Sequence, residues 1–211
     1  MTPKALDTEI TVFVVDDDVQ ARKSVCALVA SMGLAAEGFS SAEEFLATYR
    51  EGRRGCVVTD LRMLGMSGLE FQQEIIRRDW PLPVVILTAY PRTSVTVQAM
   101  RAGAVTLVEK PYRDDELWDA IAKAITEEAG LWAQQQRRRD IQARMASLTP
   151  SEREVLERLV GGMPNKAIAQ ELGLGLRTVE SRRHEVFRKM RANSLPELVR
   201  LVMEARPGGT R

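Results

Sequence analysis

Short apolar runs alternate with longer stretches of helical period along the first 130 residues of the chain. Five of these runs end at polar or turn-forming residues, and most are rich in Val, as is typical of strands buried on both faces. They are Ile10–Val15, Ala35–Phe39, Cys56–Thr59, Val84–Leu87 and Val105–Val108. Each is followed by a segment whose apolar residues recur at helical spacing: Val19–Met32, Ala42–Tyr49, Leu69–Asp79, Ser94–Ala102 and Asp114–Ala129. This alternation predicts an α/β fold, a five-stranded doubly wound parallel sheet of the flavodoxin-like kind.

The rest of the chain has only helical patterns. Residues 131–145 are polar and basic and lack Gly and Pro, which predicts a helical linker. Beyond them, Thr149-Pro150-Ser151-Glu152 has the composition of a helix start. Three further helices are expected at Pro164–Leu172, Leu176–Met190 and Leu195–Met203. The first two of these three are separated by a three-residue turn with two glycines, which is typical of a helix-turn-helix. We therefore predict a second, all-α domain of four helices.

The predicted parts are a first domain at 8–128, a linker at 129–146 and a second domain at 147–205. Their charges differ: residues 1–130 carry 14 Lys/Arg and 20 Asp/Glu, a net of −6, and the remainder carries 16 and 9, a net of +7. A basic second part favours a polyanionic partner, although ordinary solvated surface charge gives the same asymmetry.

Neither a membrane span nor a disulfide framework is expected. The sequence has no apolar run of the ~20 residues that cross a bilayer, and its N-terminus lacks the apolar core of a signal peptide. Cys26 and Cys56 are the two cysteines, too few for a framework. These features predict a reduced, cytoplasmic protein without a membrane partner.

Chemically active side chains follow four of the predicted strands. They are Asp16 and Asp17 after the first, Asp60 after the third, Thr88 after the fourth and Lys110 after the fifth. Parallel strands place these residues at one edge of the sheet, where such folds bind ligands. Several close carboxylates need a counter-charge, and a hard divalent cation such as Mg²⁺ supplies it. Asp18, by contrast, is expected to cap the helix that begins near Val19.

The motifs VVDDD, VVTDLRMLGMSG, ILTAY and VEKPY resemble the receiver domain of bacterial two-component response regulators, over residues 10–128. The resemblance implies that Asp60 accepts a phosphoryl group from a phosphohistidine of a sensor histidine kinase. It implies a Mg²⁺ site formed by Asp16, Asp17, Asp60 and the backbone carbonyl of Arg62. Thr88 would hydrogen-bond the phosphoryl group and Lys110, before a cis proline, would pair with it.

Two positions depart from the receiver pattern. Leu64 replaces the usual Pro in the segment after Asp60, which we expect to loosen that segment. Leu107 replaces the usual Tyr or Phe three residues before Lys110, so we expect the fifth-strand part of the activation switch to be muted or to work by aliphatic packing. A receiver that only dimerises, without phosphorylation, therefore remains an alternative.

A phosphatase of the haloacid-dehalogenase type is a second alternative. Asp16 would be its nucleophile and Asp18 its acid/base, in the pattern DxD after a first strand. The residue two positions after the second aspartate is Gln20 rather than the expected Thr or Val, which disfavours an enzyme.

The segments LTPSEREVL, GMPNKAIAQEL, RTVES and KMRANSLPELVRL resemble the LuxR-type helix-turn-helix of the FixJ-like branch. In the helix Leu176–Met190, the apolar residues Leu176, Val179, Val186 and Met190 are expected to pack inward and an arginine-rich face to lie outward. The resemblance implies base contacts by Glu180, Ser181 and His184. It implies phosphate contacts by Lys166, Arg177, Thr178, Arg182, Arg183 and Lys189. Its partners would be double-stranded promoter DNA and RNA polymerase, with homodimerisation upon phosphorylation.

Overall fold

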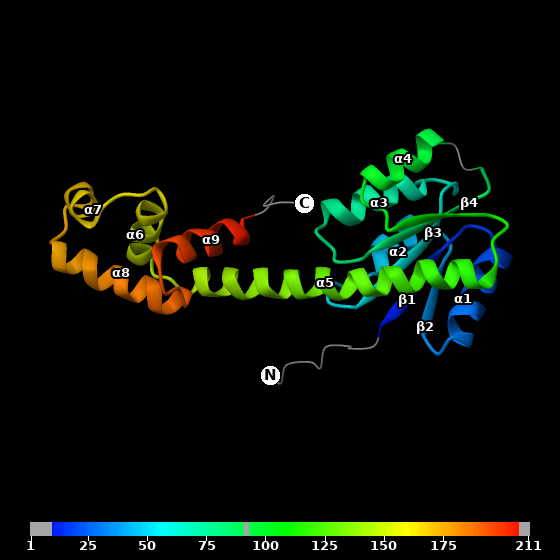
Figure 1. Cartoon of the computed structure of the whole chain (residues 1–211), viewed down its shortest axis with the longest axis horizontal. Helices are drawn as coiled ribbons and strands as arrows, with labels where there is room; N and C mark the ends of the chain where they lie inside the picture. Colours follow the sequence, from blue (N-terminus) through cyan, green and yellow to red (C-terminus); the bar gives the residue numbers. More distant parts are fainter. Residues whose placement is uncertain (1–9, 91–92, 207–211) are drawn as a thin grey trace. The chain divides into compact units, whose positions relative to one another are not determined.

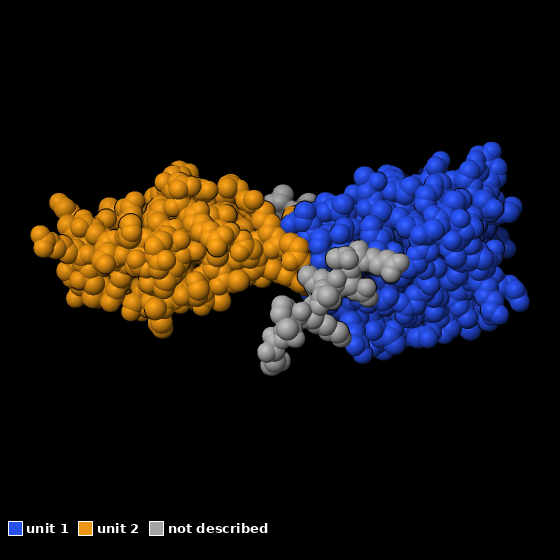
Figure 2. Space-filling view, turned by 90° about the horizontal axis from the view of Figure 1, so that it is seen from below, with its two compact units in different colours: residues 1–133 blue, residues 134–211 orange. Residues whose placement is uncertain are grey.

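The computed structural model describes residues 10–90 and 93–206, so the predicted domain start at residue 8 lies outside the described residues. The chain divides into two compact units, residues 1–133 and 134–211 (Figure 2). Within the described residues, none of the helices has the length and hydropathy that crossing a bilayer requires.

The first unit contains a parallel sheet with the strand order β2-β1-β3-β4-β5. Figure 1 shows this sheet with the helices packed around it. Its strands are β1 Thr11–Val15, β2 Ala35–Phe39, β3 Gly55–Asp60, β4 Val84–Thr88 and β5 Thr106–Glu109. The predicted fold class is confirmed. Strands β3 and β4 extend one residue beyond their predicted ends, so Asp60 and Thr88 are the last residues of their strands.

Helices cover both faces of the sheet. They are α1 Val19–Ser31, α2 Ala42–Thr48, α3 Gly68–Arg77, α4 Thr93–Arg101 and α5 Asp114–Ala146. Alternate residues of β1 enter different cores: Phe13 and Val15 pack with α2, α3 and α4, whereas Val12 and Val14 pack with α1 and α5. Burial on both faces explains why the strands read as continuous apolar runs.

A buried ion pair attaches α5 to the residue that precedes β3. The Arg54 guanidinium donates two hydrogen bonds to the Glu128 carboxylate, at 3.0 and 2.7 Å, and the Glu128 side chain is 0% exposed. The same guanidinium lies 5.5 Å from the centre of the Trp132 ring. These contacts join segments 74 residues apart within the first unit.

The second unit is helical, with α6 Pro150–Val160, α7 Asn165–Leu172, α8 Leu176–Met190 and α9 Leu195–Ala205. The predicted helix start at Thr149 is confirmed as a capping box, in which the Thr149 hydroxyl accepts from the Glu152 N–H and the Glu152 carboxylate accepts from the Thr149 N–H. Ile141 of α5 is buried in this unit's core, so part of the segment expected to be a linker packs with these helices. Gly173 ends α7 in the left-handed conformation, with φ of 65°.

One expectation for α8 is wrong. Val179, Val186 and Met190 are fully buried as predicted, but the Leu176 side chain is 38% exposed. Leu176 is the first residue of α8 and lies at the end of the buried stripe.

Candidate functional site

An ammonium group and two carboxylates meet at the carboxyl edge of the sheet. Asp16 directly follows β1, Asp60 ends β3 and Lys110 directly follows β5. The Lys110 Nζ lies 2.5 Å from Asp60 Oδ1 and 3.0 Å from Asp16 Oδ2. The Asp16 side chain is 3% exposed and that of Asp60 13%, so both charges depend on close partners. The structure thus brings together three of the predicted site residues.

The environment of Lys110 favours its charged form. Burial lowers the pKa of Lys110, but the hydrogen bonds to Asp60 and Asp16 outweigh burial, and the net pKa is raised. The Lys110 backbone N–H donates to the Thr88 carbonyl at 2.7 Å, and the Lys110–Pro111 peptide bond is cis, as expected. Lys110 is therefore a fixed positive charge beside Asp60.

Asp60 is held from a second side by the chain that follows it. Its Oδ2 accepts a hydrogen bond from the Arg62 N–H at 2.7 Å, while the Arg62 guanidinium lies 5.2 Å from the centre of the Tyr90 ring. Thr88 is buried at the end of β4, next to β3, and its hydroxyl accepts from the Tyr90 N–H at 3.2 Å. Residues 60, 62 and 88 therefore lie on adjacent segments of one edge.

The three consecutive aspartates have three different environments. Asp16 Oδ1 accepts from the Asp18 N–H at 2.9 Å, and Asp17 Oδ2 accepts from the Leu64 N–H at 2.9 Å. Asp18 Oδ1 accepts from the N–H groups of Ala21 and Gln20 in the first turn of α1, and these bonds lower the pKa of Asp18. The prediction that Asp18 caps α1 is confirmed.

The donor types at this edge fit a hard divalent cation, because Asp16, Asp17 and Asp60 all supply carboxylate oxygens. In the described conformation these three carboxylates do not converge on one point. Lys110 lies between Asp16 and Asp60, and Asp17 is bonded to Leu64. Among the residues that the structure describes, no three Asp, Glu, His or Cys side chains converge closely enough to hold a metal ion.

Two residues near the site were missed by sequence reasoning. The Glu43 carboxylate, in the first turn of α2, accepts from the Met66 N–H at 2.9 Å, and the Arg22 guanidinium donates to the Asp16 carbonyl at 2.5 Å. The Glu43 contact spans 23 residues of sequence, and the Arg22 contact reaches back from α1 to the residue after β1, so neither belongs to a local sequence motif.

Close backbone packing also positions Asp60. Gly68 begins α3 so near the end of β3 that a Cβ at this position would lie 2.4 Å from the Asp60 carbonyl oxygen. Only glycine allows this approach without moving the strand or the helix.

The second unit presents an exposed polar face on α8. Arg177, Thr178, Glu180, Ser181 and His184 are exposed, as is Lys166 on α7. Arg182 is half-buried. The other two predicted phosphate contacts have partners inside the unit: Arg183 donates to Asn165 Oδ1 at 3.0 Å, and the Lys189 Nζ lies 2.7 Å from Glu152 Oε2.

Comparison with known proteins decides between the families considered above. The model of the response regulator receiver domain matches residues 12–122, and that of the bacterial regulatory proteins of the luxR family matches residues 146–202. The transcriptional regulatory protein FixJ of Bradyrhizobium diazoefficiens is 40% identical over 200 residues, covering 95% of this chain and 98% of FixJ. The chain is a two-component response regulator.

Other relatives of this regulator agree. The transcriptional regulatory protein TdiR of Thauera aromatica is 37% identical over 196 residues, covering 92% of the regulator and 85% of TdiR. The solved structure of the response regulator StyR has a TM-score of 0.69 and 38% identity, covering 92% and 98% of the two chains. Full-length FixJ from B. japonicum has a TM-score of 0.54 and 40% identity, covering 94% and 98%. The regulator thus joins a receiver to a LuxR-type DNA-binding domain, as FixJ-like transcription regulators do.

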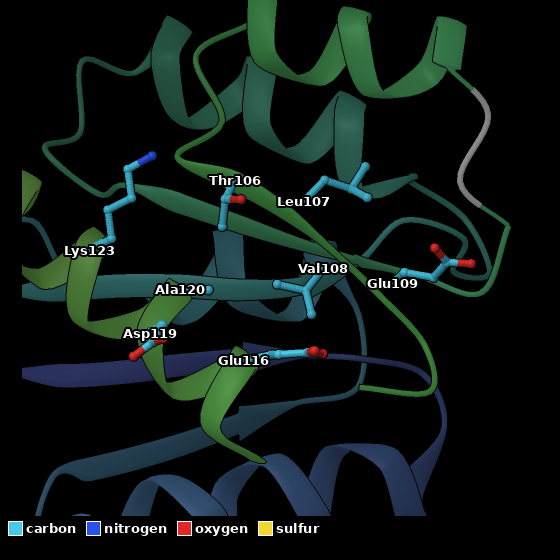
Figure 3. Close-up of a pocket in the computed structure, with 8 residues that line it drawn as sticks. All are labelled: Thr106, Leu107, Val108, Glu109, Glu116, Asp119, Ala120 and Lys123. Atoms are coloured by element: carbon cyan, nitrogen blue, oxygen red, sulfur yellow. The ribbon is translucent and has the colours of Figure 1, made fainter. Parts of the chain in front are cut away.

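The departure at residue 107 lies beside an open pocket in the receiver. The pocket has a volume of about 440 Å³ and is lined by four residues of β5 and four of α5 (Figure 3). Leu107 and Val108 project to opposite sides of β5: Leu107 packs against the core under α4, and Val108 belongs to the core under α5. Leu107 is half-buried in the described conformation.

Proposed function

We propose that the regulator is switched by phosphoryl transfer to Asp60 from a phosphohistidine of a sensor histidine kinase. The observation that carries this proposal is the 2.5 Å contact between Asp60 Oδ1 and the Lys110 ammonium. This contact places a fixed cation beside the largely buried Asp60 carboxylate, where phosphoryl charge would accumulate.

In the proposed reaction, an Asp60 carboxylate oxygen attacks the phosphorus while the bond from phosphorus to the histidine nitrogen breaks. The electron pair of that bond stays on the imidazole. Lys110 stabilises negative charge on the phosphoryl oxygens, and the Thr88 hydroxyl hydrogen-bonds the transferred group. Thr88 is suited to this role because it is buried at the end of β4, next to β3, and a hydroxyl that accepts from the Tyr90 N–H can also donate its own proton.

We further propose that Asp16, Asp17, Asp60 and the Arg62 carbonyl hold Mg²⁺, which when bound offsets phosphoryl charge that Lys110 alone does not neutralise. The carboxylate donors support this assignment. The position of Arg62 supports it as well, since its N–H already contacts Asp60 and its carbonyl belongs to the same segment.

Mass measurement tests the acceptor. Wild-type protein treated with a small phosphodonor and Mg²⁺ should gain one phosphoryl mass, and Asp60→Ala should not. Asp115→Ala is a matched control, because Asp115 is an exposed aspartate on α5 that pairs with Arg113. An adduct that persists in Asp60→Ala would overturn the assignment.

The proposed output is homodimerisation of the receiver, with pairing through α4 and β5. Val97 and Met100 support this surface, since both are apolar and exposed on α4, at 43% and 45%. The open pocket between β5 and α5 adjoins this surface only at β5. A dimer with two-fold symmetry suits two DNA half-sites about one helical turn apart.

The proposed DNA-reading surface is the exposed face of α8. Glu180, Ser181 and His184 are the candidates for base contacts, and Arg177, Thr178, Arg182 and Lys166 for phosphate contacts. Their placement supports these roles, because all except the half-buried Arg182 are exposed on the two helices of the helix-turn-helix.

Phosphorylation and output can be separated experimentally. In wild type, the phosphodonor should increase both dimer population and affinity for promoter DNA, and Asp60→Asn should show neither response. If wild type forms the adduct but neither property changes, the alternative of a phosphorylation-independent regulator is favoured. The phosphatase alternative predicts turnover that Asp16→Ala abolishes, but Asp18 caps α1 rather than standing as an acid/base.

A further inference from the structure

Leu64, which replaces the usual proline of the receiver pattern, makes a hydrogen bond through its backbone N–H. The Leu64 N–H donates to Asp17 Oδ2 at 2.9 Å, across 47 residues of sequence. A proline at this position has no N–H and cannot make this bond. The Leu64 side chain is 82% exposed, so its packing does not explain how the segment is held.

The segment after Asp60 has a second, independent anchor two residues later. The Met66 N–H donates to Glu43 Oε1 at 2.9 Å, and Gly65 between the two anchors has φ of 82°. The Glu43 carboxylate lies so close that a Cβ on Gly65 would be 2.8 Å from its Oε1. The segment is therefore tied to two carboxylates, that of Asp17 in the connection after β1 and that of Glu43 on α2.

The two carboxylates that hold this segment differ in whether they belong to the proposed metal site. Asp17 is among the residues we assign to Mg²⁺, whereas Glu43, on α2, is not. Asp16 and Asp60 share the Lys110 ammonium, and Asp17 is directed to Leu64. The Leu64 N–H is thus the hydrogen-bond donor to Asp17, as the Lys110 ammonium is to Asp16 and Asp60.

We propose that the Leu64 N–H competes with Mg²⁺ for the Asp17 carboxylate, so that metal binding releases residue 64 while Glu43 continues to hold residue 66. This inference rests on the proposed metal site. It makes Leu64 a residue that sets metal affinity through its backbone rather than its side chain. Removing the N–H should tighten Mg²⁺ binding by about three- to tenfold, in keeping with one charge-assisted hydrogen bond at an exposed position.

Amide exchange measured by NMR on the wild-type protein is the first test. Saturating Mg²⁺ should reduce the protection of the Leu64 amide and leave that of the Met66 amide unchanged, which makes Met66 an internal control. The substitution Glu43→Gln should instead weaken the protection of the Met66 amide and leave that of the Leu64 amide unchanged. Saturable Mg²⁺ binding with unchanged Leu64 protection would overturn the inference but not the metal site.

Calorimetric titration with Mg²⁺ is the second test. Leu64→Pro should lower the Kd for Mg²⁺, and Leu64→Ala, which keeps the N–H, should match wild type. Replacing residue 64 by the α-hydroxy acid analogue of leucine exchanges the N–H for an ester oxygen and keeps the side chain. This variant should act as Leu64→Pro does, which covers the case that proline disturbs folding. Equal or weaker Mg²⁺ binding in the variants that lack the N–H contradicts competition. Absence of saturable binding in wild type would instead overturn the proposed metal site, and this inference with it.

Discussion

Lys189 Nζ lies 2.7 Å from Glu152 Oε2, the same oxygen that accepts the Thr149 N–H at 2.8 Å in the capping box of α6. The pair joins the end of α8 to the start of α6, and both side chains are largely buried, at 22% and 10% exposure. Lys189 was expected from the sequence to contact DNA phosphate. Its described partner gives it a structural role inside the second unit.

The salt dependence of DNA binding should distinguish Lys189 from the exposed cations. Arg177→Ala and Lys166→Ala should each reduce the slope of log Kd against log salt by about 1, because each removes one phosphate contact. Lys189→Ala should leave the slope nearly unchanged and destabilise the second unit by about 1–2 kcal/mol. Salt titrations of binding to promoter DNA and calorimetric unfolding measure the two effects. A full unit of slope lost in Lys189→Ala would show that Lys189 leaves Glu152 to bind DNA.

The sheet edge was predictable from sequence because strand ends are local features. Asp16, Asp60 and Thr88 follow from where apolar runs stop, and Asp18 from the helix start beside it. Their neighbours across the fold were not predictable. Glu43 reaches Met66 from an element 23 residues away, and this contact depends on how α2 packs.

The charge balance at the site illustrates the same limit. Clustered carboxylates correctly indicate that a counter-charge is needed, but the residue types alone do not say which group supplies it. In the structure Lys110 supplies the counter-charge to Asp16 and Asp60, while the N–H of Leu64 is bonded to Asp17.

Leu176 was expected to be buried, and this prediction was wrong. Helical periodicity shows which face of α8 is buried, but it does not show at which residue the neighbouring helices stop covering that face.

The buried pair of Arg54 and Glu128 should be important for receiver stability. Arg54→Ala leaves the fully buried Glu128 carboxylate without its partner, and we expect a loss of about 3–5 kcal/mol in the free energy of unfolding. Arg77→Ala is the control, since the Arg77 side chain is 72% exposed in its pair with Glu74 and should change stability little. Urea unfolding followed through the receiver measures both. Similar losses in the two variants would mean that burial of Glu128 does not matter.

Glycine at position 68 should be required for the geometry of Asp60. Gly68→Ala places a Cβ against the Asp60 carbonyl oxygen, and we expect a loss of about 1–3 kcal/mol together with slower phosphoryl adduct formation. Gly130→Ala is the matched control, because its Cβ would have no neighbour within 4 Å. Alanine in place of glycine within α5 should stabilise by up to about 1 kcal/mol. Unfolding free energies and the time course of the adduct mass test these two variants. Unimpaired adduct formation in Gly68→Ala would show that the end of β3 can shift without slowing phosphoryl transfer.

Acid should weaken the second unit through Glu152. The hydrogen bond from Lys189, and then that from the Thr149 N–H, lower the pKa of Glu152 from its ordinary value of 4.5. Because the folded-state pKa is depressed, the contribution of Glu152 to stability is complete above pH 4.5 and is lost as the pH falls through the folded-state pKa. We expect wild type to exceed Glu152→Gln in stability by about 1 kcal/mol at pH 7, and the difference to shrink toward zero below pH 4. Calorimetric unfolding of the second unit in both full-length proteins from pH 3 to 7 measures this difference, in which the titration of the other carboxylates cancels. A difference that stays constant over this range would show that Glu152 gains nothing from being ionised beside Lys189.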